Sequence, residues 1–367
     1  MAELILDGHK LAWHAERVQA LLAGERVAPV TIDCALTRRC TYRCQYCYGQ
    51  LQANREYPLE LPVIQLFLDD AAAIGVKAVS FVSDGESTCH PDMVAAVLHG
   101  KAAGLDMALG TNGYLLDPED LPRLLPALTY LRFNISAGQP ARYAAIHGVA
   151  EKCFHKVRGT IARAVAVKAA LGLPVTIGLQ MVLLPAYADQ ILPLARLGLE
   201  LGVDYLVIKH CSDDENHSLG VDYAAYKALT PLLLEAEALS TPDYLVRAKW
   251  SKISSGGLRS YKRCLGPPLI LQMSGSGLVA PCGMLFSERY AAYHIGNIAQ
   301  TRFRDIWNSD RYWEVMREIA SPRFDARTMC GSLCLQHKVN ECLDALAAGR
   351  STLPDGAGPP PQHGNFI

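Results

Sequence analysis

The sequence predicts an α/β protein, built as a partial (βα)6 barrel followed by a small C-terminal α+β domain. From residue 29 onward, short apolar runs rich in β-branched residues alternate with helix-like stretches, which is typical of βα units and a parallel sheet. Beyond residue 263 the chain changes to a hairpin pattern with scattered cysteines. The length of 367 residues, of which 50% are hydrophobic, suffices for one large domain and one small one.

Six strands are expected in the barrel, at 29–36, 78–84, 106–112, 130–136, 174–184 and 205–210. Five helix-like stretches run between them, near 62–75, 92–104, 117–128, 151–171 and 188–202. Several of these stretches end at a glycine, as the C-terminus of a helix often does. Right-handed crossovers between parallel strands would curl the units into a partial barrel.

The same patterns divide the chain into five regions. These are an N-terminal helical segment at 1–28, the barrel at 29–212, a helical connector at 213–263, the small domain at 264–345 and a disordered tail at 346–367. Disorder is expected in the tail because three consecutive prolines interrupt it, although its apolar end could fold back onto the barrel.

Charge and hydropathy argue against two classes of partner. The net charge of -1 provides no basic surface for nucleic acid or for an anionic membrane. The N-terminal stretch has no apolar signal-peptide core, and no run of about 18 uncharged apolar residues would span a bilayer. We therefore expect a cytoplasmic protein with no nucleic-acid or membrane partner, in a compartment where thiols stay reduced.

Three cysteines, Cys40, Cys44 and Cys47, are the strongest functional signal in the chain. Three thiolates at this spacing can hold three corners of a [4Fe–4S] cubane and leave the fourth iron open for a ligand. A zinc site would need distant ligands, because no histidine lies between residues 15 and 89. Twelve cysteines in 367 residues are also too few for a secreted disulfide scaffold.

This Cys-x3-Cys-x2-Cys spacing, with Tyr46 before the last cysteine and Tyr48 after it, resembles the signature of the radical S-adenosylmethionine (SAM) enzymes. The resemblance covers residues 29–212 and implies a [4Fe–4S] cluster that binds SAM at its open iron. In parallel barrels the active site gathers at the C-terminal ends of the strands, and nearly every strand end expected here is polar. The SAM site is therefore expected at that mouth of the barrel.

Several residues at these strand ends match SAM contacts of the family. Gly85-Glu86 resembles the second half of the Gly-Gly-Glu-Pro-like turn that binds the SAM amino group, with Asp84 and Ser87 in place of the first glycine and the proline. The other contacts that the resemblance implies are Tyr46 at the adenine, Asn112, Asn134 and Ser136 at the ribose and carboxylate, and Gln180 on the fifth strand. The alternative is turn chemistry alone, because Asn-Gly and Asp-Gly pairs are common turn formers.

The small domain combines a hairpin with five cysteines. An apolar segment followed by a Gly-rich turn at 274–277 predicts the β-hairpin. The cysteines are Cys264, Cys282, Cys330, Cys334 and Cys342. Together with the Gly-Asn-Ile run at 296–298 and the Ile-Trp-Asn-Ser run at 306–309, this pattern resembles the SPASM/twitch extension of radical SAM proteins.

Five thiols suffice for one auxiliary [4Fe–4S] cluster, because two fully protein-ligated clusters would need eight. The resemblance favours Cys264, Cys282, Cys330 and Cys334 as its ligands, with Cys342 as a substitute for one of them. A structural zinc ion on the same thiols is the alternative.

The resemblance also implies a reaction. A flavodoxin- or ferredoxin-like donor would supply one electron, SAM would be cleaved to methionine and a 5'-deoxyadenosyl radical, and that radical would remove a hydrogen atom from the substrate. Oxidation follows if the auxiliary cluster accepts the electron of the substrate radical, and epimerisation follows if a thiol returns a hydrogen atom. Cys211, just after the sixth strand, is the candidate catalytic thiol.

The substrate is less well defined by the sequence. Acidic and histidine residues at 209–217 suggest a small polar molecule such as a sugar or an aminosugar, unless this run is only an exposed charged loop. Two other functions stay open. One is a radical SAM maturase that modifies a peptide or protein, and the other is a non-catalytic iron–sulfur or zinc-binding protein.

Overall fold

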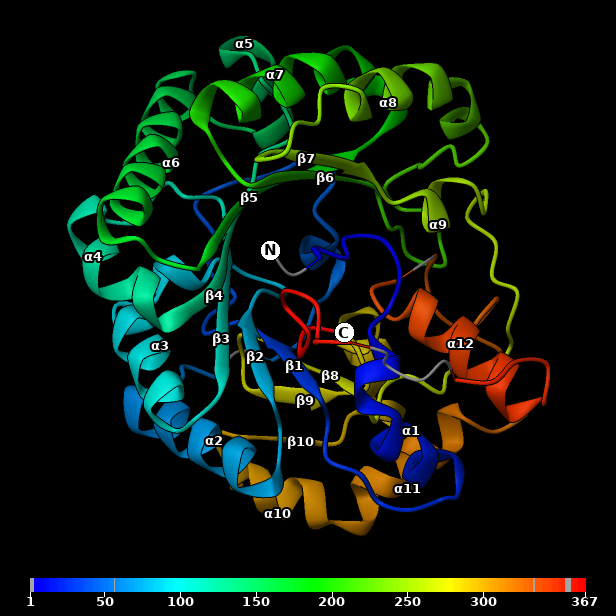
Figure 1. The fold of residues 1–367 in the computed structure, drawn as a ribbon. Helices are drawn as coiled ribbons and strands as arrows, with labels where there is room; N and C mark the ends of the chain where they lie inside the picture. Colours follow the sequence, from blue (N-terminus) through cyan, green and yellow to red (C-terminus); the bar gives the residue numbers. More distant parts are fainter. Residues whose placement is uncertain (1–2, 56, 333, 354–357) are drawn as a thin grey trace.

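The fold is built on one strongly curved sheet with helices along its outer side (Figure 1). A computed structural model describes residues 3–55, 57–332, 334–353 and 358–367. In these residues the strands follow the order β10-β9-β8-β1-β2-β3-β4-β5-β6-β7. Their bounds are β1 Thr31–Cys34, β2 Ala78–Phe81, β3 Asp106–Thr111, β4 Leu128–Asn134, β5 Thr176–Leu183, β6 Tyr205–His210, β7 Leu245–Ala248, β8 Ile270–Met273, β9 Leu278–Ala280 and β10 Gly296–Asn297. Strands β8 and β1 to β7 are parallel to one another, and β8, β9 and β10 form an antiparallel meander.

Helices connect the parallel strands and cover the outside of the barrel. The barrel helices are α2 Leu61–Ile74, α3 Met93–Ala102, α4 Leu121–Leu124, α5 Pro140–His147, α6 Lys152–Leu171, α7 Ile191–Leu201 and α8 Thr230–Glu237. The remaining α-helices are α1 Ala15–Leu22, α9 Trp250–Ile253, α10 Phe303–Asn308, α11 Asp310–Ile319 and α12 His337–Ala347. Short 3-10 helices are η1 Leu11–His14, η2 Tyr48–Leu51, η3 Ser87–Cys89, η4 Pro118–Asp120, η5 Leu125–Ala127, η6 Pro185–Gln190, η7 Ala225–Leu229, η8 Gly283–Leu285 and η9 Glu288–Tyr293. The six predicted strands correspond to β1 to β6, so the predicted partial barrel is confirmed.

Strand β7 corrects the expectation of a purely helical connector at 213–263. It pairs in parallel with β6, with Leu245 opposite Tyr205. The preceding Tyr244 is buried, and its hydroxyl donates a hydrogen bond to the Ala195 carbonyl oxygen at 2.8 Å. Contacts with α7 and β6 therefore place this strand, and a run of four residues has no sequence periodicity that would reveal it.

The hairpin of the C-terminal domain extends the barrel sheet. Strand β8 pairs in parallel with β1, with Thr31 opposite Ile270 and Cys34 opposite Met273. The C-terminal domain is therefore continuous with the barrel through β1. The region boundaries expected at residues 28, 212, 263 and 345 stay predictions.

The two faces of the barrel sheet differ in chemistry because successive side chains of a strand point to opposite faces. Ile32, Val79 and Leu109 are fully buried in the apolar core. Asp33 and Arg132, from β1 and β4, instead line the inner cavity of the barrel. Parallel sheets with both faces covered are usually apolar on both faces, so a polar interior marks the functional part of the molecule.

The tail was expected to be disordered unless its apolar end folds back onto the barrel, and in the described residues 358–367 it does fold back. Figure 1 shows the C-terminus inside the ring of strands. Phe366 packs with Ala78, Ala108 and Tyr130 in a separate apolar cluster, and Thr31 donates from its hydroxyl to the Asn365 carbonyl oxygen at 2.6 Å. The tail is held because the Phe366 ring fills the space inside the barrel that the small side chains of Ala78 and Ala108 leave free.

No α-helix in the described ranges combines the length and the apolar character that crossing a membrane requires.

Replacing Phe366 by Ala should lower the free energy of unfolding by about 3 kcal/mol, because it removes a buried ring that packs edge-on against Tyr130 and leaves a cavity. Urea denaturation followed by circular dichroism measures the change. The matched control is Leu258→Ala, whose side chain is 76% exposed and whose loss should change stability by less than about 0.5 kcal/mol. Equal stability of the two variants would contradict the packing of the tail.

Candidate functional site

The three cysteines of the loop after β1 lie around one cavity. Cys40, Cys44 and Cys47 all line a cavity of about 320 Å³ at the C-terminal ends of the barrel strands. Two nitrogen donors approach the Cys40 sulfur, the backbone N–H of Tyr42 at 3.4 Å and the side-chain amide of Asn112 at 3.9 Å. The loop therefore presents three sulfurs and nearby donors to the same space, as a cluster with one open iron requires.

A histidine that the sequence reasoning missed contacts the second cysteine. His147, at the end of α5, is fully buried, and its Nε2 accepts a hydrogen bond from the backbone N–H of Ser136 at 3.1 Å. This bond fixes the tautomer, so the Nδ1–H donates to the Cys44 sulfur 3.1 Å away. Burial lowers the pKa of His147 to about 3, which keeps the ring neutral. Its place 103 residues after Cys44 gave no sequence signal for this contact.

Two thiols of this loop, those of Cys40 and Cys44, need a metal partner to ionise. Burial raises the pKa of Cys40 to about 11, and burial together with the neighbouring Cys47 raises the pKa of Cys44 further. Bound metal deprotonates a coordinating thiol outright. In the described parts of the chain, no three His, Cys, Asp or Glu side chains are arranged to share a single metal ion. The donor set fits a cluster, whose separate irons each take one thiolate.

The turn after β2 brings Gly85 and Glu86 to the cavity. A β-carbon on Gly85 would lie 1.9 Å from the Thr37 carbonyl oxygen, so the turn can pass the cysteine loop only with glycine at this position. The Glu86 carboxylate accepts hydrogen bonds at 2.7 Å from the Thr111 hydroxyl and from the Asn112 backbone N–H. Glu86 thereby fixes the end of β3 against the turn while one side of it faces the cavity.

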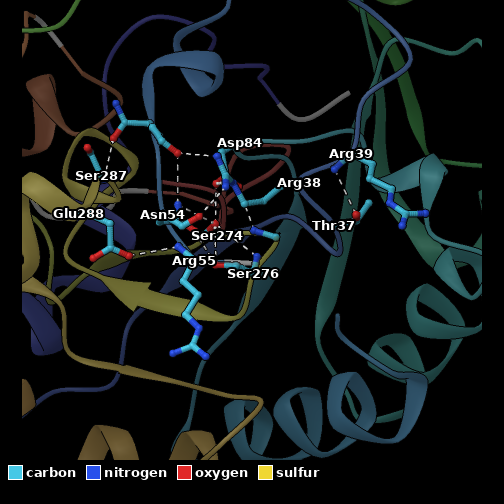
Figure 2. A network of polar contacts seen from close by, with 12 residues as sticks. Thr37, Arg38, Arg39, Asn54, Arg55, Asp84, Ser274, Ser276, Ser287 and Glu288 are labelled. Atoms are coloured by element: carbon cyan, nitrogen blue, oxygen red, sulfur yellow. Dashed lines mark hydrogen bonds and ion pairs between the residues drawn. The ribbon is translucent and has the colours of Figure 1, made fainter. Parts of the chain in front are cut away.

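Asp84 connects the same turn to the C-terminal hairpin (Figure 2). Its carboxylate accepts hydrogen bonds from the Ser274 hydroxyl at 2.5 Å and from the Gly275 backbone N–H at 2.9 Å. Arg38 lies 3.4 Å from the same carboxylate and donates to the Asn54 carbonyl oxygen at 2.8 Å. An aspartate stands here instead of the first glycine of the family turn because its carboxylate anchors the hairpin.

The structure brings most of the predicted SAM contacts to one cavity. The predicted contacts that line it are Tyr46, Gly85, Glu86, Asn112, Asn134 and Gln180. Asn134 accepts a hydrogen bond from the Gln180 side-chain amide at 2.7 Å, so these two act as a pair. Ser136 is different. It is fully buried, lies outside the cavity lining, and its hydroxyl oxygen accepts a bond from the Val182 N–H at 3.1 Å, which is a structural role.

Cys211 was expected at the cavity, and the structure does not place it there. His210 and Ser212 line the cavity, whereas Cys211 is 1% exposed and its sulfur lies 3.4 Å from the Ser212 carbonyl oxygen. Strand β6 ends at His210, so the alternation of inward and outward side chains does not extend to Cys211. Burial raises the pKa of this thiol to about 12. The Cys211 sulfur also lies 3.7 Å from the Tyr46 carbonyl oxygen of the cysteine loop, so the thiol is engaged by backbone carbonyls and does not line the cavity.

The acidic residues after β6 also lie elsewhere than expected. Asp213 accepts hydrogen bonds from the backbone N–H groups of Asp214 and Leu219, both within its own loop. Asp214 is paired with Arg289 at 3.4 Å. These carboxylates fold the loop, so they do not form the acidic wall on which the sugar or aminosugar expectation rested.

A second group of thiols lies in the C-terminal domain. Cys264, Cys282, Cys330 and Cys334 line one small cavity, together with Arg259 and Tyr261. Burial, followed by the charge of Cys334 and Cys330, raises the pKa of Cys264. Arg259 donates to the carbonyl oxygens of Ala326 and Ser332, both at 2.5 Å, and so stays beside the thiols. The half-buried Arg259 guanidinium compensates the negative charge that four thiolates would bring.

Cys342 lies apart from this group. It is on α12, where it packs against the apolar cluster that contains Leu11 and Val18, and it does not line the thiol cavity. Cys334, in contrast, lines both the thiol cavity and the barrel cavity. The two cysteine sites therefore share a wall.

Comparison with known proteins agrees with this geometry. The family model of the Radical SAM superfamily matches residues 35–197, and the SPASM model, an iron–sulfur cluster-binding domain, matches residues 264–335. An AdoMet-dependent heme synthase of Methanosarcina barkeri is 26% identical over 333 residues, which cover 85% of this chain and 90% of that protein. A PqqA peptide cyclase of a Methylobacterium species is 28% identical over 308 residues, which cover 79% of this chain and 76% of that protein.

Solved structures share the fold. Streptococcus suis SuiB bound to S-adenosylmethionine matches with a TM-score of 0.62 and 15% identity, over 83% of this chain and 72% of that one. At this identity the likeness concerns the fold alone.

Cys330 and Cys342 should differ in their effect on iron content. Replacing Cys330 by Ala should lower the iron of the reconstituted protein from about eight atoms per chain toward about four, because the auxiliary cluster loses one of its four thiolates. Cys342→Ala should keep about eight. Iron and sulfide determination on both variants checks this. Loss of iron in Cys342→Ala alone would show that Cys342 is the ligand.

Replacing Asp84 by Ala should destabilise the fold by about 2 kcal/mol, since the Ser274 hydroxyl, the Gly275 N–H and Arg38 would lose a buried acceptor. Thermal unfolding of the wild type and the variant measures this loss. Asp120→Ala is the control, because it breaks only an exposed i,i+3 ion pair with Arg123 and should cost less than about 1 kcal/mol. Similar losses in both variants would contradict the anchoring role of Asp84.

Proposed function

Because the chain belongs to the radical SAM superfamily and carries an iron–sulfur cluster-binding SPASM domain, we propose that it oxidises a substrate bound in the barrel cavity after removal of a hydrogen atom. The observation that carries this proposal is the continuity of the cavity. One end is lined by Cys40, Cys44 and Cys47, and Cys334 of the second thiol group lines the same space. A substrate between them would lie next to both cluster sites.

The cofactors are SAM, a SAM-binding [4Fe–4S] cluster and an auxiliary cluster. When bound, they supply a 5'-deoxyadenosyl radical at one end of the cavity and an electron acceptor at the other. Glu86 and Asn112 would bind SAM beside the cysteine loop. The hydrogen-bonded Asn134–Gln180 pair would orient it from β4 and β5, and the tail at the opposite end of the barrel excludes water.

Oxidation is favoured over epimerisation by the position of the thiols. Epimerisation needs a hydrogen donor that faces the substrate, and Cys211 lies outside the cavity lining. Cys334, in contrast, brings the auxiliary site to the cavity wall. An electron can leave the substrate on this side without crossing the barrel.

A reduced flavodoxin- or ferredoxin-like protein would deliver the first electron at the outer edge of the cysteine loop. Cys40 is exposed, and Arg39 and Arg43 beside it are exposed as well. These cations would attract the acidic surface of such a donor.

The substrate is a polar group small enough to enter the cavity. A peptide side chain is the second candidate beside a small molecule, and the likeness to PqqA peptide cyclases over 79% of this chain favours it. Solved SuiB, whose fold is similar, is also known bound to the precursor peptide SuiA. A sugar or aminosugar is not proposed.

The test is 5'-deoxyadenosine formation from SAM with dithionite as reductant, in anaerobically reconstituted protein. The wild type should contain about eight irons per chain and cleave SAM, and the Cys40/Cys44/Cys47 triple Ala variant should contain about four irons and cleave none. Cys89→Ala is the control, since this free thiol lines neither cysteine site and its loss should leave both values unchanged. SAM cleavage that survives in the triple variant would refute the proposal.

A further inference from the structure

Two basic side chains that are not among the predicted SAM contacts line the barrel cavity. Arg132 of β4 and Lys209 of β6 both line it, with Asp33 of β1 as the acid nearest to them. The other two carboxylates of the lining, Asp84 and Glu86, belong to the turn after β2 and are engaged by protein donors.

The Arg132 guanidinium is held in place, but one of its nitrogen donors has no hydrogen-bond acceptor among the described residues. Its guanidinium lies over the Tyr130 ring at 5.4 Å, and in register it has a glycine on both neighbouring strands, Gly110 on β3 and Gly178 on β5. Its Nε is buried and has no hydrogen-bond partner within the described residues. A buried, unpaired guanidinium nitrogen is unfavourable unless a ligand supplies the acceptor.

Positive charge exceeds negative charge around this pair. Burial lowers the pKa of Lys209 well below its ordinary range, and Arg132, Lys252 and Lys249 lower it further by repulsion. Asp7 is the carboxylate that acts on Lys249 and Lys252. An anion bound in the cavity would offset this repulsion and hold the proton on the Lys209 amine, which burial and its basic neighbours otherwise disfavour.

His210 supplies a second unsatisfied group at the same cavity. Its ring is 1% exposed, and its Nδ1 lies 2.7 Å from the Cys211 carbonyl oxygen, to which it donates. The Nε2 is therefore an acceptor, and it has no partner in the described part of the chain. A hydroxyl or amino group of a ligand would satisfy it.

SAM itself carries a carboxylate, but its position argues against these cations as its partner. SAM must reach the cluster at the mouth of the barrel, where the cysteine loop lies. Arg132 comes two residues before Asn134 on β4, which places it about 6 to 7 Å deeper in the barrel than the strand end. Arg132 is thus on the side of the cavity left for the substrate, and Lys209, one residue before the end of β6, approaches it from the mouth of the barrel.

We propose that Arg132 and Lys209 bind a carboxylate group of the substrate in the barrel cavity, between β4 and β6. This inference rests on the proposed function and names the substrate class, a carboxylic acid. A planar guanidinium binds a carboxylate through two parallel hydrogen bonds, and Lys209 adds a third donor. The bound group would be oriented with its carbon chain toward the cysteine loop.

Titration calorimetry on the reconstituted, SAM-loaded protein tests this, with succinate as the probe and neutral succinamide as its match. The wild type should bind succinate and not succinamide. Arg132→Gln and Lys209→Gln should each weaken succinate binding by about tenfold or more, because each removes a charge-assisted hydrogen bond. Arg123→Gln, which changes an exposed arginine, should bind as the wild type does.

Two variants guard against misfolding. Arg132 is half-buried inside the barrel, so its replacement affects packing, whereas Lys209→Gln tests the site with Arg132 intact. Near-ultraviolet circular dichroism of each variant reports whether its packing is native. Succinate binding that is unchanged in both natively folded variants would overturn the proposal, and so would a preference for inorganic phosphate over succinate. A tenfold loss of SAM affinity in Arg132→Gln would assign the cations to the cofactor and overturn it as well.

The proposed function has a separate readout. Formation of 5'-deoxyadenosine without substrate is measured in the wild type and should be the same in Arg123→Gln, which changes an exposed arginine outside the cavity lining. Loss of succinate binding in Arg132→Gln and Lys209→Gln, with SAM cleavage present in the wild type, supports the carboxylate site. Absence of SAM cleavage in the wild type would instead refute the enzyme reaction, whatever the succinate result.

Discussion

The peptide bond between Thr37 and Arg38 is the point where the two cluster-binding halves of the molecule meet. A β-carbon on Gly85 would lie 1.9 Å from the Thr37 carbonyl oxygen, and one on Gly275 would lie 2.4 Å from the same atom. Glycine alone lets two backbones approach one peptide this closely. The turn after β2 and the tip of the β8–β9 hairpin therefore both pack against the start of the cysteine loop. Asp84 of the turn accepts hydrogen bonds from Ser274 and Gly275 of the hairpin, which links the two. The position of the C-terminal domain is set by the same contacts that shape the turn after β2.

The interior of the barrel explains how so polar a cavity is tolerated. Buried charge is unfavourable, and Asp33, Arg132 and Lys209 all lie on the inner face of the sheet. The compensating stability lies on the outer face, where one continuous apolar core joins the strands to the helices. Below the cavity, Phe366 and Tyr130 seal the barrel with apolar contacts. The apolar core between strands and helices thus stabilises the fold, and the polar inner face of the sheet is left free to line the cavity.

The parts of the site that sequence could predict are those with local signals. The Cys40–Cys44–Cys47 spacing and the six barrel strands are visible in short windows of sequence, and the structure contains strands at all six places. Contacts that depend on distant segments gave no such signal. His147 lies 103 residues after Cys44 in the sequence, so no short window shows their contact. Asp84 departs from the glycine of the family turn, and only its hydrogen bonds to Ser274 and Gly275 explain the departure. Disorder was expected in the tail because its prolines are visible in a short window of sequence. The pocket that holds Phe366 is formed by residues of three strands, and no short window shows it.

The pairing of β1 has a consequence for how the chain folds during synthesis. Strand β1 obtains its first neighbour, β2, at residue 78, but its second neighbour, β8, begins only at residue 270. While about 190 further residues leave the ribosome, one edge of the central strand stays unpaired and open to pairing with another chain. Such long-range closure is slow, and exposed parallel edges invite aggregation. Slower translation or chaperone binding in this interval should therefore affect the yield of native protein more than changes in its final stability do.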